Sequence, residues 1–333
     1  MIRKWTIAVG AAFALASAGA LFAQTSVKAP GGDLHYPTKP IRLISAFAPG
    51  GGASAVARMI APELTEAWGQ SVVVDNRPGA GGSIGTEMAA RAPADGYTLV
   101  MATASTIVIN PLVGKVPFDP INDFTPVVHT STVPLVLAVH PSVPAKSVKE
   151  LIAYARTPGT QLNFSSSGEG TISHFAGELF KSMAKVDMVH VPYKGGGQAI
   201  IDLIAGHVQV GFLNILEALP QINGGRIRAL AVSTPKRSPV VPTIPTVAEA
   251  GLPGYEVIQW SGILAPAGVP KSVVTKLNVE VNRVLARADM RERFIGGGAE
   301  PGSGSPEQFG TLIRSEIGKW SKVVKTIKLD VQR

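Results

Sequence analysis

Four glycine- and serine-rich stretches are the parts of this chain whose residue types and spacing could do chemistry. They cover residues 49–54, 78–83, 165–171 and 194–197, and each follows a strand-like apolar run and precedes a helix-like segment. The first amide N–H groups of a helix have no partner inside the helix, and aligned peptide dipoles place about half a positive charge there. Each stretch is therefore a candidate site for a carboxylate or a phosphate.

These stretches are expected to gather at one place in the fold. Loops that leave the carboxyl ends of strands commonly bind the ligand in open α/β sheets. Two stretches lie in the first half of the chain and two in the second, so a cleft between the halves would grip an elongated anion at both ends. Taken alone, each stretch also fits an ordinary tight turn between a strand and a helix.

The first stretch also fits a dinucleotide-binding fingerprint. Gly50, Gly52 and Ala55 match G-x-G-x-x-G/A directly after a strand, and Asp75 ends the next strand 20 residues later. The alternative function is thus an NAD-dependent oxidoreductase that uses this loop and Asp75. An export signal at the N-terminus and the position of Pro49 inside the turn make it the second choice.

Other catalytic or metal-binding patterns find little support. The chain has no cysteine and lacks the P-loop and HExxH motifs. His174 with Glu178 is only an i, i+4 pair, and Glu169 is a loop carboxylate of the kind that is usually solvated. We therefore expect no catalytic residues, no metal and no cofactor.

Alternating strand-like and helix-like segments predict an α/β fold with parallel strands. Residues 127–141 could form one long strand that crosses between two halves, and residues 256–266 look like a strand that returns. Residues 269–294 carry apolar positions at helical spacing, and a last helix is expected to start at Pro306 after Ser305 as N-cap.

Length and composition indicate a globular protein of two domains, and the N-terminal segment indicates that it is exported. The chain has 333 residues, of which 45% are apolar and 16% charged. Residues 1–23 resemble a cleaved secretory signal peptide, and residues 24–35 a flexible tail. Removing the basic residues of the signal peptide leaves 29 basic and 23 acidic residues, a net charge of +6. This dispersed charge, with few aromatic residues, argues against nucleic-acid binding.

Several blocks of sequence resemble the Bug family, the periplasmic solute-binding receptors of tripartite tricarboxylate transporters. The blocks are FAPGGGAS (47–54), VVVDNRPGAGGSIGTEMAARAPADGYTL (72–99), NFSSSGEGTISHFAGELF (163–180), VPYKGGGQAIIDLIAGHVQVGF (191–212) and PTVAEAGLPGYE (245–256). The resemblance covers nearly all of the expected mature chain in the right order, and DNRPGAGGSIG is its most specific part.

The resemblance implies a fold, a location and partners. The fold would be a two-lobed periplasmic binding protein, a Venus flytrap of the type II kind, with a mostly parallel sheet and flanking helices in each lobe. Lobe 1 would comprise residues 36–135 and 257–333, lobe 2 residues 136–256, with the hinge near 135 and 257. A periplasmic monomer would bind a small carboxylate and deliver it to the transporter's membrane subunits.

The resemblance also implies the binding residues. In the family, the first glycine loop and the Ser/Gly/Thr loop of the second lobe hold a carboxylate through backbone amides. Carried over, the ligand-binding residues are Phe47, Gly50, Gly51, Gly52, Ala53, Ser54, Thr103, Ser105, Ser166, Ser167, Gly168, Thr171, His174, Tyr193 and Asn214.

One position departs from the family pattern. Ser54 stands where the family commonly has an aspartate that can pair with the amino group of an amino-acid ligand. Serine provides no such charge, so the hypothesis is a ligand without an ammonium group, either a di- or tricarboxylate or an aromatic acid.

Overall fold

The computed structural model describes residues 35–327. The predicted signal peptide and, apart from His35, the predicted tail lie outside the described residues. Tyr36 is already part of the core. Its side chain is buried, and its hydroxyl donates a hydrogen bond to the Gly96 carbonyl oxygen at 2.7 Å.

The first part of the described chain has the alternation of strands and helices that its sequence predicts. Three parallel strands lie in the order β2-β1-β3. The strands are β1 (Ile41–Ser45), β2 (Val72–Asn76) and β3 (Thr98–Thr103), and the helices are α1 (Gly52–Trp68), α2 (Ser83–Ala90) and α3 (Asn110–Val113). A 3-10 turn at Ala80–Gly82 precedes α2, and a π-helical turn at Ser105–Ile109 precedes α3.

The middle of the chain forms a second group of strands. Strand β5 is parallel to β6 and β7, whereas β7 and β8 run antiparallel to β4. The elements are α4 (Val148–Ala155), β5 (Asn163–Ser166), α5 (Ile172–Ala184), β6 (Val189–Pro192), α6 (Gly196–Ile204), β7 (Val210–Asn214), α7 (Ile215–Asn223) and β8 (Arg228–Val232).

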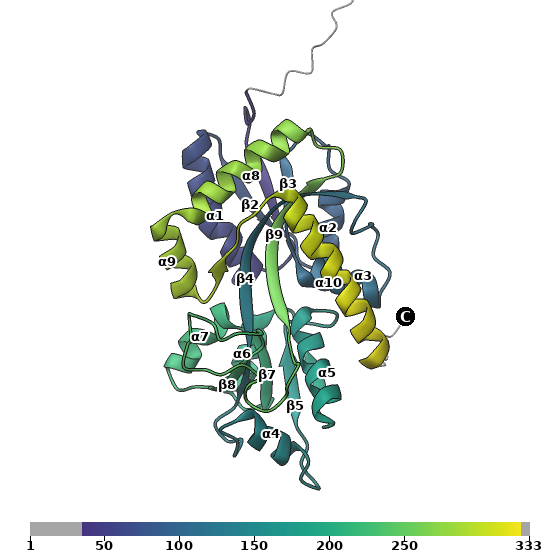
Figure 1. The fold of residues 1–333 in the computed structure, drawn as a ribbon, viewed down its shortest axis with the longest axis vertical. Helices are drawn as coiled ribbons and strands as arrows, with labels where there is room; N and C mark the ends of the chain where they lie inside the picture. The colour runs from purple at the N-terminus through teal and green to yellow at the C-terminus, as the bar shows by residue number, and fades with distance from the viewer. Residues whose placement is uncertain (1–34, 328–333) are drawn as a thin grey trace, which may run out of the picture. The chain divides into compact units, whose positions relative to one another are not determined.

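Two long antiparallel strands join these groups, as the sequence predicts. They are β4 (Phe124–Val139) and β9 (Ile258–Pro266), and both run from the upper to the lower half of Figure 1. Strand β4 pairs with β9 up to Pro134 and with β7 from Leu135 onward. The described chain is therefore a two-lobed α/β protein. Its division at 135, where β4 changes its pairing from β9 to β7, and at 257, just before β9, remains a prediction.

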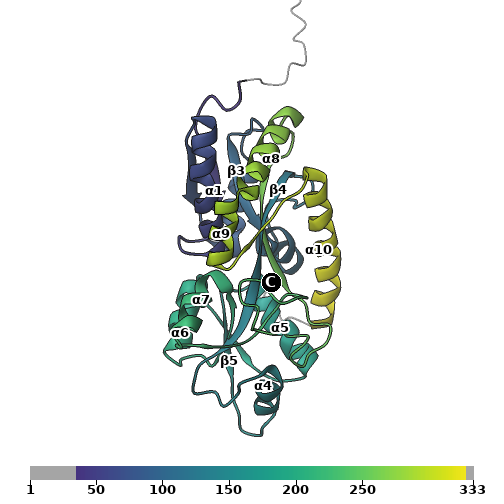
Figure 2. The same ribbon diagram turned by 60° about the vertical axis from the view of Figure 1, so that its left-hand side comes forward.

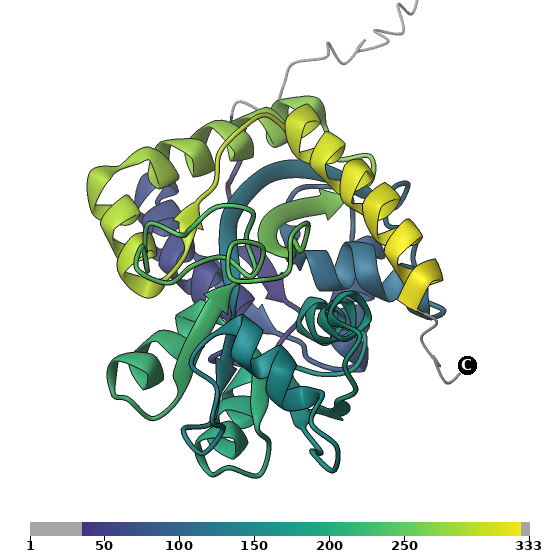
Figure 3. The ribbon, with the colours of Figure 1, turned by 60° about the horizontal axis from the view of Figure 1, so that its bottom comes forward.

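The sheet separates two hydrophobic cores. Helices α1, α6, α7, α8 (Lys271–Ala286) and α9 (Ala288–Gly297) pack in one core, and α2, α4, α5 and α10 (Pro306–Ile327) in the other. Figures 2 and 3 show α1 and α10 on opposite sides of the crossing strands. Along β4, Val136 and Ala138 enter the first core and Leu135 and Leu137 the second, which is the alternation that a buried strand requires.

The C-terminal segment contains one more helix than its periodicity predicts. The expected helix over 269–294 ends at Ala286 because Arg287 has an extended backbone, with φ −63° and ψ 141°. The Arg287 guanidinium binds Glu63 on α1 and Asp289 at the start of α9, and these bonds hold the chain in its new direction. The short strand β10 (Glu300–Pro301) then pairs with β4.

The last helix begins as its sequence predicts. Ser305 Oγ accepts a hydrogen bond from the Gln308 N–H at 3.3 Å, and Pro306 is the first helical residue.

Gly262 allows α10 to pack against the crossing strands, and we expect Gly262→Ala to destabilise the protein. A Cβ at Gly262 would clash with the Phe309 ring of α10 and lie 2.8 Å from the Val128 carbonyl oxygen of β4. Overpacking of this kind costs about 1–3 kcal/mol, measurable as a lower urea midpoint with an unchanged slope. Gly318→Ala in α10 is the control. Its Cβ would meet nothing within 4 Å, so the variant should match or exceed the wild type in stability.

Candidate ligand-binding site

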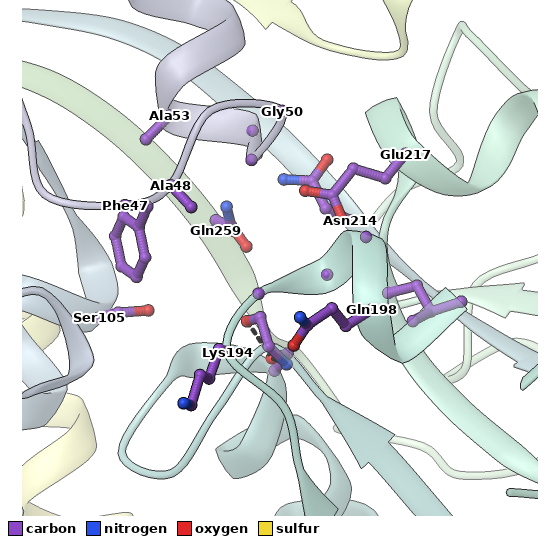
Figure 4. A pocket seen from close by; sticks show the side chains of 18 of the residues that line it. Phe47, Ala48, Gly50, Ala53, Ser105, Lys194, Gln198, Asn214, Glu217 and Gln259 are labelled. Carbon is purple, nitrogen blue, oxygen red and sulfur yellow. Dashed lines mark hydrogen bonds between the residues drawn. The ribbon is translucent and has the colours of Figure 1, made fainter. Parts of the chain in front are cut away.

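A cavity of about 370 Å³ lies where the loop after β1, the loop before α6 and the crossing strands meet (Figure 4). It is lined by lobe 1 (47–53, Thr103, Ser105), by the crossing strands (Leu135, Gln259) and by lobe 2 (Ser167, Ser173, 194–198, Ile201, 212–214, Glu217). Backbone from two of the four glycine-rich stretches forms much of this wall.

Two helices begin at the cavity without a side-chain cap. The N-cap of α1 is Gly51 and that of α6 is Gly195, and neither helix has an acidic residue in its first turn. Gly50 and Gly195, with φ +91° and +146°, give the backbone the turn that brings each helix start to the cavity. The N-cap glycines offer no side chain to the first amides of these helices, so α1 and α6 are suited to bind anions.

The N-terminus of α5, by contrast, is capped by side chains from both lobes. Thr171 Oγ1 accepts a hydrogen bond from the His174 N–H at 3.4 Å. Ser105 Oγ accepts one from the Ile172 N–H at 2.9 Å, and Ser173 Oγ one from the Ser167 N–H at 3.0 Å. These bonds occupy amides that the 165–171 stretch would otherwise offer to a ligand.

Asn214 and Glu217 form the wall beside the start of α1. Asn214 Oδ1 caps α7 by accepting a hydrogen bond from the Leu216 N–H at 2.9 Å. Glu217 accepts a hydrogen bond from the Gly52 N–H, which by itself lowers the pKa of the carboxyl group. Burial has the larger effect and raises the pKa of Glu217 to about 7.

The other side of the cavity carries hydroxyl groups and apolar side chains. Ser167 Oγ and Ser173 Oγ lie 2.8 Å apart. In Figure 4, Phe47 and Ser105 lie across Gln259 from Asn214 and Glu217. The cavity thus has polar groups at two ends.

A family model described as a tripartite tricarboxylate transporter family receptor matches residues 56–329. The chain belongs to this receptor family. Its sequence is 36% identical to protein BugT of Bordetella pertussis over 93% of this chain and 96% of BugT.

Two solved structures share the fold. The R. palustris protein Rpa4515 with adipate is 41% identical, with a TM-score of 0.85 over 88% of this chain and 98% of the other. MatC (Rpa3494) from Rhodopseudomonas palustris with bound malate is 33% identical, with a TM-score of 0.81 over 87% of this chain and 100% of the other. The family resemblance and the two-lobed α/β fold predicted from the sequence are confirmed.

The cavity of this receptor brings together many of the residues expected to bind the ligand. Those that line it are Phe47, Gly50, Gly51, Gly52, Ala53, Thr103, Ser105, Ser167 and Asn214. Those that do not line it are Ser54, Ser166, Gly168, Thr171, His174 and Tyr193. The assignment of ligand contacts remains a prediction for both groups.

Hydrogen bonds and ring packing within the receptor hold several residues of the second group away from the cavity. The Tyr193 hydroxyl donates to Asp202 Oδ2 at 2.6 Å. His174 stacks on His190 with ring centroids 3.8 Å apart, and burial lowers the pKa of His174 to about 4, so its ring is neutral at pH 7. Thr171 Oγ1 donates to the Gly168 carbonyl oxygen at 2.6 Å.

Ser54 is fully buried, and its Oγ accepts a hydrogen bond from Asn76 Nδ2 at 2.9 Å. The inference drawn from Ser54 about ammonium groups therefore has no cavity contact to support it.

Sequence reasoning missed four polar side chains of the cavity, namely Ser173, Gln198, Glu217 and Gln259. Glu217 follows the N-cap Asn214 by three residues, the spacing of a capping box, so its pattern indicates a helix cap before it indicates a ligand contact. Gln259 lies near the start of a buried strand, and the residue pattern of that strand does not mark it as a ligand contact.

The geometry does not favour the dinucleotide alternative. Asp75, which would bind a ribose, instead accepts hydrogen bonds from Arg42 Nε at 2.7 Å and Arg77 Nε at 3.0 Å. The two guanidinium groups lower the pKa of Asp75 although partial burial opposes them. This carboxylate is already satisfied within lobe 1.

Residues 35–327 include no group of three or more histidine, cysteine, aspartate or glutamate side chains placed to hold a metal ion. Over the same residues, no helix combines the length and the apolar character needed to cross a bilayer.

Proposed function

We propose that this receptor binds a small carboxylate between its lobes in the periplasm and delivers it to the membrane subunits of a tripartite tricarboxylate transporter, without catalysing a reaction. The observation that carries the proposal is the pair of uncapped helix starts, α1 and α6, at one cavity. Similar receptors with adipate and with malate support the same class of ligand.

The arrangement suits an elongated dicarboxylate such as adipate. One carboxylate would accept hydrogen bonds at the start of α1 and α6, and the other would accept them from hydroxyls such as those of Ser105 and Ser167. The methylene chain between them would contact Phe47, Leu135 and Phe212.

Lys194 favours anions in this cavity because it is the only basic side chain among the lining residues. It is supplied by lobe 2, whereas α1 belongs to lobe 1. A ligand that contacts both lobes binds best when they are close, so it shifts the receptor toward its closed conformation.

A thermal-shift panel on the chain starting at Gln24 tests the proposal. We expect adipate, malate or another di- or tricarboxylate to raise the melting temperature, because a ligand at 100 times its dissociation constant stabilises the native state by about 2.7 kcal/mol. Benzoate tests the aromatic class, and NAD tests the oxidoreductase alternative. Stabilisation by NAD with none by any carboxylate would overturn the proposal.

A further inference from the structure

Two polar atoms in the cavity wall have no hydrogen-bond partner within residues 35–327: Asn214 Nδ2 and Glu217 Oε2. Both atoms are inaccessible to water, and the whole Asn214 side chain is only 8% exposed. A buried polar group without a partner destabilises the protein, because it has lost its hydrogen bonds to water and gained none in return. Two such atoms side by side at a cavity (Figure 4) indicate that a ligand completes their hydrogen bonds.

The position of this pair is set by glycines at both helix starts. A Cβ on Gly52 of α1 would clash with Asn214 Nδ2, and a Cβ on Gly196 of α6 would clash with Glu217 Oε2. The absence of side chains there lets the two unpartnered atoms reach the space between the amides of α1 and α6. They lie at the place where the proposed function puts a ligand carboxylate.

Glu217 has to be compatible with that carboxylate. Two ionised carboxylates in contact repel each other strongly in a partly buried site, whereas a neutral acid can donate its proton to a carboxylate oxygen. An ammonium group would suit an ionised Glu217, but it would lie against two helix starts that favour negative charge. The surroundings of the pair therefore favour a carboxylate.

We propose that Glu217 binds one carboxylate of a dicarboxylate ligand as a neutral acid, with Asn214 Nδ2 as a second donor, so that ligand and one proton are captured together. This inference rests on the proposed function and names the class of ligand end group that the site selects. No covalent bond changes. The proton that Glu217 donates in its hydrogen bond comes from solvent whenever Glu217 is ionised in the empty receptor.

The charged groups that face Glu217 are few. Lys194 lies before α6 in the same cavity, and Arg226 follows α7 beside a neighbouring hollow that Glu217 also lines. Neither forms an ion pair with Glu217 within the described residues. On the side of α1 the hydrogen-bonding group is the Gly52 backbone amide. With a pKa of about 7 in the empty receptor, Glu217 is the cavity carboxyl that changes charge near neutral pH.

Calorimetry with adipate at pH 6.5 and 8.5, in two buffers of different ionisation enthalpy, measures proton uptake directly. The wild type should take up close to one proton at pH 8.5 and much less at pH 6.5, and its Kd should weaken on the order of tenfold over this range. Glu217→Gln keeps a donor of the same shape, so it should bind adipate with no uptake and with a flat pH profile. Glu292→Gln, which removes an exposed carboxylate on α9, should behave as the wild type.

A matched pair of ligands tests whether the site beside Glu217 prefers a carboxylate or an ammonium group at the end of the ligand. Adipate and 6-aminohexanoate have the same chain length, but the second carries an ammonium group in place of one carboxylate. The inference requires adipate to bind more tightly. Tighter binding of 6-aminohexanoate, adipate binding without proton uptake at pH 8.5, or uptake that persists in Glu217→Gln would each overturn it. Failure of both ligands and of malate while benzoate, a monocarboxylate, stabilises the receptor would also overturn it, yet would leave the proposed function standing.

Discussion

Gly52→Ala is expected to weaken carboxylate binding at least tenfold while the receptor keeps its fold. The new Cβ would clash with Asn214 Nδ2, and Asn214 cannot turn away without breaking the cap that its Oδ1 provides to Leu216. The wall of the cavity would have to move, and a misplaced binding group costs about 1.4 kcal/mol for each tenfold loss of affinity. Titration calorimetry with adipate measures the change.

The fold should tolerate this substitution because Gly52 is the first residue of α1 and does not have a positive φ. Alanine is also the better helix former. Gly296→Ala in α9 is the control. Gly296 does not line the cavity, and its Cβ would meet nothing within 4 Å. Equal affinities for the wild type and Gly52→Ala would show that this part of the cavity wall does not contact the ligand.

Trp320→Ala is expected to destabilise the receptor by about 3–5 kcal/mol, the usual cost of removing a large buried ring. Trp320 on α10 is fully buried, and its ring meets Phe175 of α5 edge to face with centroids 6.0 Å apart. Its Nε1 donates a hydrogen bond to Glu316 Oε2 at 3.1 Å. The substitution leaves a cavity and also removes a partner from a buried carboxylate.

Urea unfolding followed by circular dichroism measures the loss. Trp320→Phe should recover much of it, since a ring remains in the cavity, and Lys325→Ala on the exposed side of α10 should change stability by less than about 0.5 kcal/mol. A change for Trp320→Ala as small as that for Lys325→Ala would mean that α10 does not hold the two lobes together through this contact.

The fold could be predicted largely from the sequence because its signals are local. Apolar runs followed by glycine and then by apolar residues at helical spacing predicted the strands of both lobes. The long strand-like stretch over 127–141 predicted the crossing strand β4. The end of α8 could not be predicted, because the bonds of Arg287 to Glu63 join residues far apart in the sequence.

The site was predicted less completely for the same reason. The glycines of the first loop are recognisable from their spacing, and they do line the cavity. Whether the amides of 165–171 are free depends on partners such as Ser105, which is supplied by the other lobe. The place of Glu217 depends on how α7 is set against α1, and only the folded structure shows that.

The continuity of β4 has a mechanical consequence. Strand β4 passes from its ladder with β9 directly into its ladder with β7, so turning one lobe against the other has to twist a strand that is hydrogen-bonded on both sides of the boundary. Because twisting this strand costs free energy, we expect one angle between the lobes to be preferred in the empty receptor. We expect the empty receptor to show a single narrow distribution of distances between spin labels placed on the two lobes, with adipate shifting its centre. A broad distribution in the empty receptor would mean that the joint swings freely.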